Sequence, residues 1–559
     1  MGLAVLAWWG SPESYGLSLS QLEQIAGTGT NTAGIILCWD DGQSPSCLGW
    51  GMRWNGGSTI QDLWNTVTNA DFGLTGSVLE SPAWAAYHRP TRAGDLLPRL
   101  SGETSIRTAY ATDHFTVTGG TWLAWITTGS DYRVGSAEPF DSLLPGDQLL
   151  PDSWILWVQS TGAIARTPGY PLPAVHYPFA SSVVAYQVGD AIPPFDWMNG
   201  EDFTNRTTLL GRPTVDTTGD DDIPTNHPVP VTVCYPAFRA HEVATVTSNG
   251  VVILAFDHTV LDHPMNPYGI DLILFGNSLS SLAANQTWTN GPPQEAILAG
   301  SSTGESALLD VSVDGTNWVA LPGLLQLDGF APTTGRELDA TTPDPALGPD
   351  NLWWGGPSDP TLPVNPALDP DDWAGYSVAG ITACYRGSAG GYGVDLSSLD
   401  LPADPLTGIK GFRYLRIRSF DQQPEIDAVA DVSPAFPYDL WQLDHFPWLS
   451  DPVEALEASD PDVDGDANLI EYAGNHDPLQ YDPTPAWRPQ VDPGAGELIY
   501  QSVPAPDLRL GFQSVAEPVH PDWLDLAPFL IEFLPGSVRY HLATTGSYRM
   551  VRMQAVRHD

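Results

Sequence analysis

Glycine and proline interrupt this chain along its whole length. The 559 residues include 54 glycines and 52 prolines, so a turn-forming residue recurs about every five positions, which is too often for long helices. An apolar fraction of 42% excludes a disordered chain. The sequence therefore predicts a mainly β protein, and the chain length predicts several domains.

Changes in sequence pattern divide the chain into units. The first apolar run is either a truncated signal sequence or a first buried segment, since it lacks a basic start. A Pro and Asp-rich insert, 340–372, reads as a surface loop because strands follow it. The predicted units are this first run (1–20), a small α+β domain (21–165), a β-sandwich (179–433), an acidic helix-loop-helix segment (434–480), a linker (481–496) and a small C-terminal β unit (497–559).

Residues 32–54 predict two strands around a turn. Ser58 is expected to cap the helix that follows, in which Ile60, Leu63 and Val67 have helical spacing. Between 179 and 433, short alternating segments separated by turn residues predict a β-sandwich of the jelly-roll kind. Near 434 the pattern changes to helices, one over 438–449 and a second over 468–474 that Gly474 ends.

The four cysteines are compatible with export. Cys38 and Cys47 flank a turn-rich stretch, so a hairpin would place them within reach of a disulfide. Cys234 and Cys384 either pair, if distant strands meet, or remain buried thiols.

The charge balance excludes several partners. Asp and Glu number 67 against 22 Lys and Arg, a formal net charge of −45, which repels nucleic acid and anionic lipid. No apolar stretch has the length of a transmembrane segment. Two explanations of the acidity remain open, solubility of an exported protein and collection of cations.

One acidic stretch has the spacing of a calcium loop. Counted from Asp460, the pattern D-x-[DN]-x-[DN]-G-x5-E places Gly465 at position 6 and Glu471 at position 12. Alternate residues of such a loop point inward, the glycine permits the sharp turn and the glutamate closes the shell. The alternative is a solvated acidic turn, which has no reason to place the glycine and the glutamate correctly. The predicted ligands of an EF-hand-like calcium site are Asp460, Asp462, Asp464, Asp466, Asn468 and Glu471.

This loop and its flanks, LWQLDHFPWLSDPVEALEASDPDVDGDANLIEYAGNHDPL, resemble the calcium-loop segment of exported Verrucomicrobia and Planctomycetes proteins, related to thrombospondin type 3 and dockerin half-repeats. The stretches VSVDGTNWVALPG and YLRIRSFDQQPEIDAVADV resemble bacterial cell-surface proteins associated with PEP-CTERM sorting. That likeness implies a galactose-binding or discoidin-like jelly roll in which strands 414–417 and 425–431 pair, and an extracellular or cell-surface location.

Other acidic residues and histidines are weaker metal candidates. Asp271, Glu425, Asp427 and Asp431 sit on or beside predicted strands, where they would bind a second cation, form a glycosidase pair or face solvent. Asp271, Glu425 and Asp427 are the candidate ligands of the second metal site. The stretch 257–263 contains His258 and His263 with neighbouring aspartates. It reads either as a metal cluster or as a turn with satisfied hydrogen bonds.

Two further features concern ligands and catalysis. Trp353 and Trp354 lie in a predicted loop and are candidates for an exposed binding platform. Ser302 formally matches G-x-S-x-G, but a strand follows it where a nucleophile needs a helix. We therefore expect no catalytic residue and no enzymatic activity.

The sequence as a whole predicts a secreted or cell-surface binding protein stabilised by calcium, with a glycan or small-molecule ligand. The alternatives are a carbohydrate-active hydrolase and a surface carrier of a tetrapyrrole such as cobalamin or haem.

Overall fold

The structure is a computed structural model of the 559-residue chain. The residues that it describes are 17–41, 46–71, 74–79, 83–87, 114–115, 117, 121–129, 138–140, 144–160, 171–196, 200–217, 229–284, 295–301, 305–327, 329–334, 358–404, 408–446, 452–482, 490–492, 497–502, 507–515, 524–526, 528, 530–534, 537–543 and 550–557. Most of the predicted signal sequence, residues 1–16, lies outside this set.

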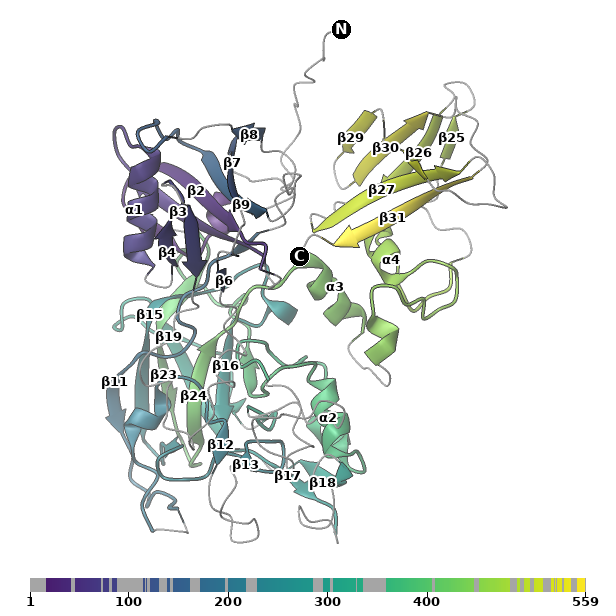
Figure 1. The fold of residues 1–559 in the computed structure, drawn as a ribbon. Coiled ribbons are helices and arrows are strands. Elements are labelled where there is room, and N and C mark those ends of the chain that lie inside the picture. The colour runs from purple at the N-terminus through teal and green to yellow at the C-terminus, as the bar shows by residue number, and fades with distance from the viewer. Residues whose placement is uncertain are drawn as a thin grey trace.

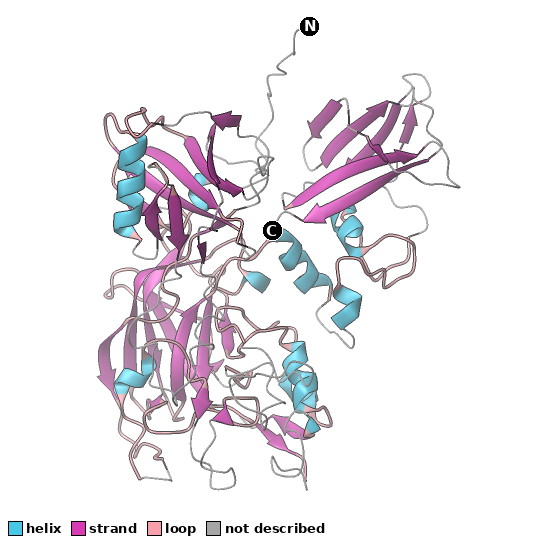
Figure 2. Ribbon diagram, viewed as in Figure 1, coloured by secondary structure: helices cyan, strands magenta, loops and turns pink. Residues whose placement is uncertain are grey.

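The protein is mainly β, as predicted (Figure 2). Its strands form separate sheets in an N-terminal unit, a central sandwich and a C-terminal unit (Figure 1). Within the described part of the chain, none of the helices combines the length and apolar character needed to cross a membrane.

The N-terminal unit contains one mixed sheet with the strand order β1-β3-β2-β9-β7-β8, and β10 pairs with β3. Since β10 belongs to this sheet, the unit extends past the predicted boundary at 165. A small second sheet has the order β4-β5-β6. The bounds are β1 (Ile25–Gly27), β2 (Asn31–Cys38), β3 (Cys47–Trp54), β4 (Leu74–Ser77), β5 (Trp84–Tyr87), β6 (His114–Phe115), β7 (Thr121–Thr128), β8 (Glu138–Phe140), β9 (Ser153–Ser160) and β10 (Leu172–Pro173).

Both faces of this mixed sheet are covered. Alternate residues of β2 and β9, such as Ile35 and Trp157, pack with helix α1 (Ile60–Ala70). The intervening residues, such as Ile36 and Leu156, pack against the segment that holds Leu17 and Leu22. A strand covered on both faces is apolar at nearly every position, which explains the continuous apolar run in β9.

Helix α1 begins where the apolar spacing predicts, with one correction. Its N-cap is Thr59, not Ser58. The Thr59 hydroxyl accepts a hydrogen bond from the Asp62 backbone N–H, and the Asp62 carboxylate accepts one from the Thr59 N–H. This reciprocal pair satisfies two donors of the first turn.

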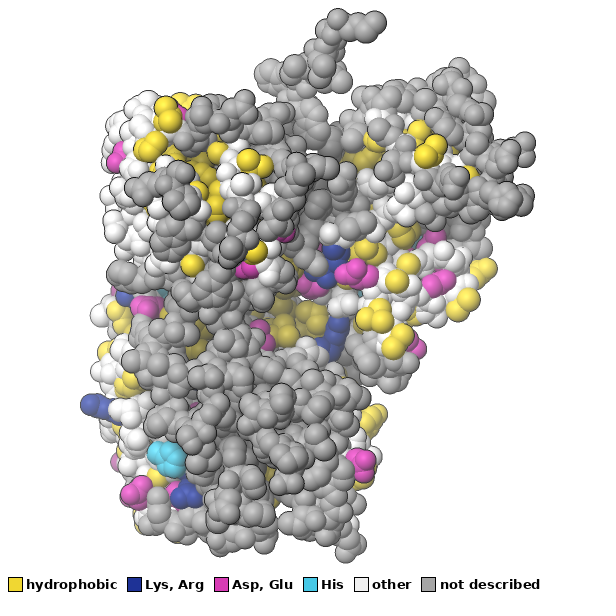
Figure 3. Space-filling view, viewed as in Figure 1, with side chains coloured by type: hydrophobic (Ala, Val, Ile, Leu, Met, Phe, Trp, Pro, Cys, Tyr) yellow, Lys and Arg dark blue, Asp and Glu magenta, His cyan; other side chains and the backbone are white. Residues whose placement is uncertain are grey.

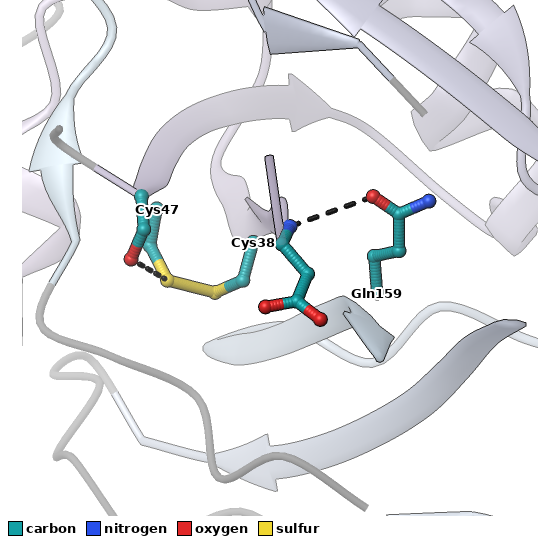
Figure 4. Close-up of a disulfide and its surroundings, with 5 residues drawn as sticks. Cys38, Cys47 and Gln159 are labelled. Carbon is teal, nitrogen blue, oxygen red and sulfur yellow. Dashed lines mark hydrogen bonds between the residues drawn. A yellow bond between two sulfur atoms is a disulfide. The ribbon is translucent and has the colours of Figure 1, made fainter. Parts of the chain in front are cut away.

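The predicted disulfide between Cys38 and Cys47 is present (Figure 4). The two cysteines are opposite each other where β2 pairs with β3, with their Cα atoms 4.1 Å apart. Beyond β2, the Asp40 N–H donates to the Gln159 side-chain oxygen at 3.4 Å. Cys234 and Cys384 are free thiols that belong to one apolar cluster.

The central unit is a sandwich of two antiparallel sheets. One has the order β11-β15-β23-β19-β20 with β21 paired to β19, and the other has the order β14-β24-β16-β22. Their inner faces share one core, with Leu254 and Leu415 from the first sheet and Leu274 from the second. The bounds are β11 (Ser182–Gln187), β14 (Ala244–Thr245), β15 (Val251–Leu261), β16 (Leu272–Gly276), β19 (Ser306–Ser312), β20 (Val319–Ala320), β21 (Leu325–Gln326), β22 (Tyr392–Val394), β23 (Gly411–Arg418) and β24 (Glu425–Asp431).

The pairing of strands 414–417 and 425–431, implied by the family resemblance, is wrong. β23 is flanked by β15 and β19, while β24 is flanked by β14 and β16 in the other sheet. Each strand already has neighbours on both edges, so the two strands lie in opposite layers of the sandwich.

A side unit of the sandwich was not predicted. Part of the insert expected to be a surface loop is buried, because Val364 and Leu368 pack with helix α2 (Val378–Cys384) in one apolar cluster. Residues 340–357 lie outside the described set. Two small strand pairs are β12 (Asp216–Thr217) with β13 (Val229–Pro230), and β17 (Ser280–Leu282) with β18 (Leu298–Ser301).

The last part of the chain contains two helices followed by two sheets. Helix α3 ends at His445, earlier than predicted, and the left-handed residue after α4 is Asn475, whereas Gly474 lies inside the helix. The strand 490–492 pairs within a sheet, although it falls in the predicted linker. The bounds are α3 (Pro437–His445), α4 (Asn468–Gly474), β25 (Gln490–Asp492), β26 (Glu497–Ser502), β27 (Leu508–Val515), β28 (Leu524–Asp525), β29 (Leu530–Leu534), β30 (Ser537–Ala543) and β31 (Met550–Arg557).

Candidate metal centre

The acidic loop precedes α4 and closes on its own carboxylates. The Asp464 N–H lies 3.2 Å from a carboxylate oxygen of Asp460 and 3.2 Å from one of Asp462. The Gly465 N–H donates to the other Asp460 oxygen at 2.9 Å. Gly465 has φ 102°, a conformation that suits glycine. The glycine of the predicted pattern therefore makes the turn that brings the carboxylates together.

Three loop carboxylates converge. Ligand oxygens of Asp460, Asp462 and Asp464 all lie within 4.8 Å of one another. Three negative charges at this separation repel strongly. An oxygen-only cluster of this kind suits a hard cation such as Ca²⁺.

Glu471 lies on α4 in a buried position, near the loop but outside the group of three convergent aspartates. The residue is 2% exposed. Burial, followed by the charges of Asp462 and Asp464, raises the pKa of the Glu471 carboxyl to about 8. Its Oε2 atom and the Oδ2 atom of Asp462 are buried and have no hydrogen-bond partner among the described residues. A buried carboxylate without a partner is costly, and a cation would remove that cost.

The protein supplies no counter-charge here. Among the residues that the structure describes, no lysine, arginine or histidine forms an ion pair with Asp460, Asp462, Asp464 or Glu471. The loop therefore has the ligands of a metal site and lacks an internal substitute for the metal.

The other two predicted ligands are Asp466, in the loop, and Asn468, the first residue of α4. Asp466 is buried and donates its N–H to an Asp464 carboxylate oxygen at 2.9 Å. The Asn468 side-chain N–H₂ donates to the carbonyls of Glu454 and Leu456, each at 2.8 Å. Asn468 thus anchors the loop to the preceding turn, a role that its sequence position did not indicate.

The second predicted metal set is not brought together. Asp271 directly precedes Leu272, and Leu272 is opposite Asp431 where β16 pairs with β24. Asp427 lies toward the other end of this pairing, next to the residues that are opposite Phe275 and Gly276. Four residues of a strand separate these positions by about 13 Å. Asp271 therefore lies at one end of β16, while Asp427 and Glu425 lie at the other.

Asp427 and Glu425 have other surroundings. The buried Asp427 carboxylate accepts hydrogen bonds from the Thr214 N–H at 2.7 Å and from the Thr214 hydroxyl at 3.0 Å. Burial raises the pKa of Asp427 well above its ordinary value. Glu425 is opposite Thr245 on the sheet edge. These contacts explain Asp427 as a buried structural carboxyl.

The ring nitrogens of His258 and His263 all have hydrogen-bond partners in the protein, as the second of the two interpretations predicts. The two nitrogens of His258 lie 2.9 Å from Asp257 and 2.9 Å from Asp431. Burial alone would lower the pKa of His258, but these two hydrogen bonds outweigh it and raise the pKa to about 9. His263 bonds the Gln21 carbonyl at 3.2 Å and accepts the Met265 N–H at 3.2 Å.

A further acidic cluster, which the sequence analysis did not assemble, contains Asp262, Asp271 and Asp395. Each of these residues flanks a strand, so adjacent strand ends could have indicated it. Trp353, Trp354 and Ser302 lie outside the described residues.

No protein-family model and no curated protein sequence matches the chain.

Proposed function

We propose that this chain is a calcium-stabilised, non-catalytic binding protein of the cell exterior or cell surface. The observation that carries the proposal is Glu471, a buried glutamate whose Oε2 atom has no hydrogen-bond partner in the described structure and which adjoins three converging aspartates. The Cys38–Cys47 disulfide supports an oxidising location.

The position of the loop supports a structural use of calcium. α3 and α4 lie between the sandwich and the C-terminal strands (Figure 1). On the sandwich side, the Arg386 guanidinium donates to the Gln442 side chain at 2.7 Å and to the carbonyls of Gln442 and Phe446.

On the C-terminal side, Asp507 accepts the Tyr438 N–H at 2.7 Å and the Tyr472 hydroxyl at 2.8 Å. Arg557 pairs with Asp439 at 3.0 Å and with Glu457 at 3.3 Å. Figure 3 shows basic and acidic side chains side by side over this junction. Since Tyr472 follows Glu471 directly on α4, a cation on Glu471 would also hold the contact with Asp507.

The ligand of the proposed protein is a glycan or a small molecule, as expected for a jelly-roll surface module. Of the carboxylates from which a hydrolase would be built, Asp427 lies toward the other end of β16 from Asp271, and Asp431, which is opposite Leu272, contacts His258 at 2.9 Å. No observation on the described residues favours the hydrolase or the tetrapyrrole carrier.

Calcium titration by calorimetry on the intact protein tests the proposal. Glu471→Gln is expected to abolish one binding site, because it removes the anionic ligand that closes the loop. Glu454→Gln is the matched control, since this glutamate is exposed in the same segment. Equal calcium binding by the wild type and Glu471→Gln would contradict the proposal. A glycan screen with and without chelator then addresses the ligand.

A further inference from the structure

We infer that the sandwich has a second site for a hard divalent cation, formed by Asp262, Asp271, Asp395 and the side-chain oxygen of Asn266. The three carboxylates place oxygens within 4.8 Å of one another. This site is independent of the loop at 460–471.

The fold brings these residues together from three strand ends. Asp262 follows β15, Asp271 precedes β16 and Asp395 follows β22. Leu272 is opposite Val394 in the antiparallel pair of β16 and β22. One position further along, Asp271 and Asp395 are therefore also opposite each other. Like charges directly opposite each other on a sheet are destabilising unless something offsets them.

Asp271 is the buried centre of the group. It is fully buried and accepts the Leu396 N–H at 2.9 Å and the Asn266 side-chain N–H₂ at 2.9 Å. These hydrogen bonds come from neutral donors, so they do not neutralise the cluster.

The one lysine of the chain lies near enough for its charge to act on Asp262, but its ammonium group bonds backbone carbonyls. Lys410 directs its ammonium group toward the carbonyl of Leu399, at 3.2 Å, and that of Ser397, at 3.5 Å. Among the described residues it makes no ion pair with Asp262, Asp271 or Asp395. Three carboxylates therefore share one nearby positive charge.

Asn266 supplies an independent observation. The residue is 4% exposed, and its side-chain amide is in contact with the Asp271 carboxylate. Its Oδ1 atom is buried with no hydrogen-bond partner within the described structure. A cation at the cluster would give that oxygen a partner. Three carboxylates, one amide oxygen and water make a donor set of the kind that Ca²⁺ accepts.

The site lies on a segment that connects the sandwich to the N-terminal unit. The segment between Asp262 and Asp271 also carries Met265, which packs into the core of the N-terminal unit, and His263, which bonds the Gln21 carbonyl. A cation would fix this segment at the junction of the sandwich with the N-terminal unit, as the loop at 460–471 does for the C-terminal unit.

The test is calcium calorimetry on the intact protein in the Glu471→Gln background, where the first site is removed. We expect one remaining site, and Asp395→Asn is expected to weaken it at least tenfold, as an order-of-magnitude estimate for losing one of three anionic ligands. Asp395 is exposed, and asparagine keeps the acceptor for the Ser397 N–H, so the fold is retained. Asp400→Asn, an exposed aspartate on the same segment, is the matched control.

Two outcomes would overturn the inference. The first is no calcium binding by Glu471→Gln, which leaves the loop at 460–471 as a sufficient explanation of all binding. The second is a remaining site whose affinity Asp395→Asn and Asp262→Asn both leave unchanged. A site in this background that prefers Mg²⁺ over Ca²⁺ would overturn the choice of calcium. Failure of the loop proposal gives a different result: the wild type and Glu471→Gln would then bind calcium with the same number of sites and the same affinity.

Discussion

A comparison of two groups of carboxylates in this protein shows opposite ways of balancing their charge. At the end of the sandwich, Asp257 and Asp431 share His258, a cation supplied by the protein. In the loop at 460–471, Asp460, Asp462 and Asp464 converge with no such partner among the described residues. The first group has its counter-charge within the folded chain, whereas we propose that the second takes an external cation.

The difference shows that net charge does not by itself indicate metal binding. His258 is buried and stacks on His176, with ring centroids 4.7 Å apart and an interplanar angle of 9°. Its two hydrogen bonds use both ring nitrogens. In the loop, the available donors are backbone N–H groups, which orient the carboxylates without neutralising them.

The largest expected effect comes from removing the internal cation. His258→Leu removes the cation that contacts the largely buried Asp431 and is expected to cost about 3 kcal/mol in the free energy of unfolding. Denaturant unfolding measures this loss. His241→Leu is the control, since the His241 side chain is 62% exposed, and equal stability of the two variants would contradict the role given to His258.

Removing the external cation is expected to have the next largest effect. A site that is saturated at 100 times its dissociation constant stabilises the folded state by about 2.7 kcal/mol. Chelation should therefore lower the melting temperature of the wild type by more than that of Glu471→Gln, which keeps only the inferred second site. An equal shift in both proteins would mean that calcium acts elsewhere.

The two groups should also differ in pH dependence. The pKa of His258 is raised from 6.5 to about 9 in the folded state, so its stabilising contribution is complete below about pH 6.5 and is lost as the pH rises through 9. Relative to His258→Leu, the wild type should lose roughly 2 kcal/mol between pH 6 and 8.5. The comparison is made in excess calcium by denaturant unfolding.

The unfolding free energy of His258→Leu must be subtracted from that of the wild type, because burial shifts the pKa values of other histidines in the opposite direction. Burial lowers the pKa of His176 to about 3 and that of His263 to about 4. Their contributions are complete above about pH 6.5. That of His263 is shared by both proteins, and burial, which both proteins retain, is the largest cause of the lowered pKa of His176. A pH profile of His258→Leu that parallels the wild type would refute the assignment.

The smallest effect concerns the contact between the loop segment and the C-terminal unit. Tyr472→Phe removes the hydroxyl that donates to Asp507, at a cost of about 1.5 kcal/mol. Hydrogen exchange should increase in α4 and at the start of β27. Tyr481→Phe serves as the control because Tyr481 is 60% exposed, and unchanged exchange in Tyr472→Phe would argue against coupling across this contact.

Local patterns were predictable from the sequence. The loop at 460–471 depends on residues within twelve positions, and so do the cap region of α1 and the hairpin that joins Cys38 to Cys47. In each case the interacting groups are close in the chain, so their spacing alone restricts the geometry. The helix ends were less accurate, since Asn475 takes the left-handed conformation expected at Gly474.

Contacts between distant residues were not predictable in this way. The sequence pattern predicts one site from Asp271, Glu425 and Asp427, yet the register of β16 with β24 separates Asp271 from the other two. Asp271 instead lies in one cluster with Asp262 and Asp395. Likewise, His258 meets Asp431 only because two sheets bring their strand ends together.

The sequence by itself thus determined the β-rich character of the protein, the covalent hairpin and the turn of the acidic loop at Gly465, because each depends on composition or on short-range spacing. The tertiary structure alone decided which carboxylates share a protein cation, which converge without one, and which units adjoin each cluster. The physical reason is that the energy of a charge depends on its burial and on its neighbours in space, and strand register sets both.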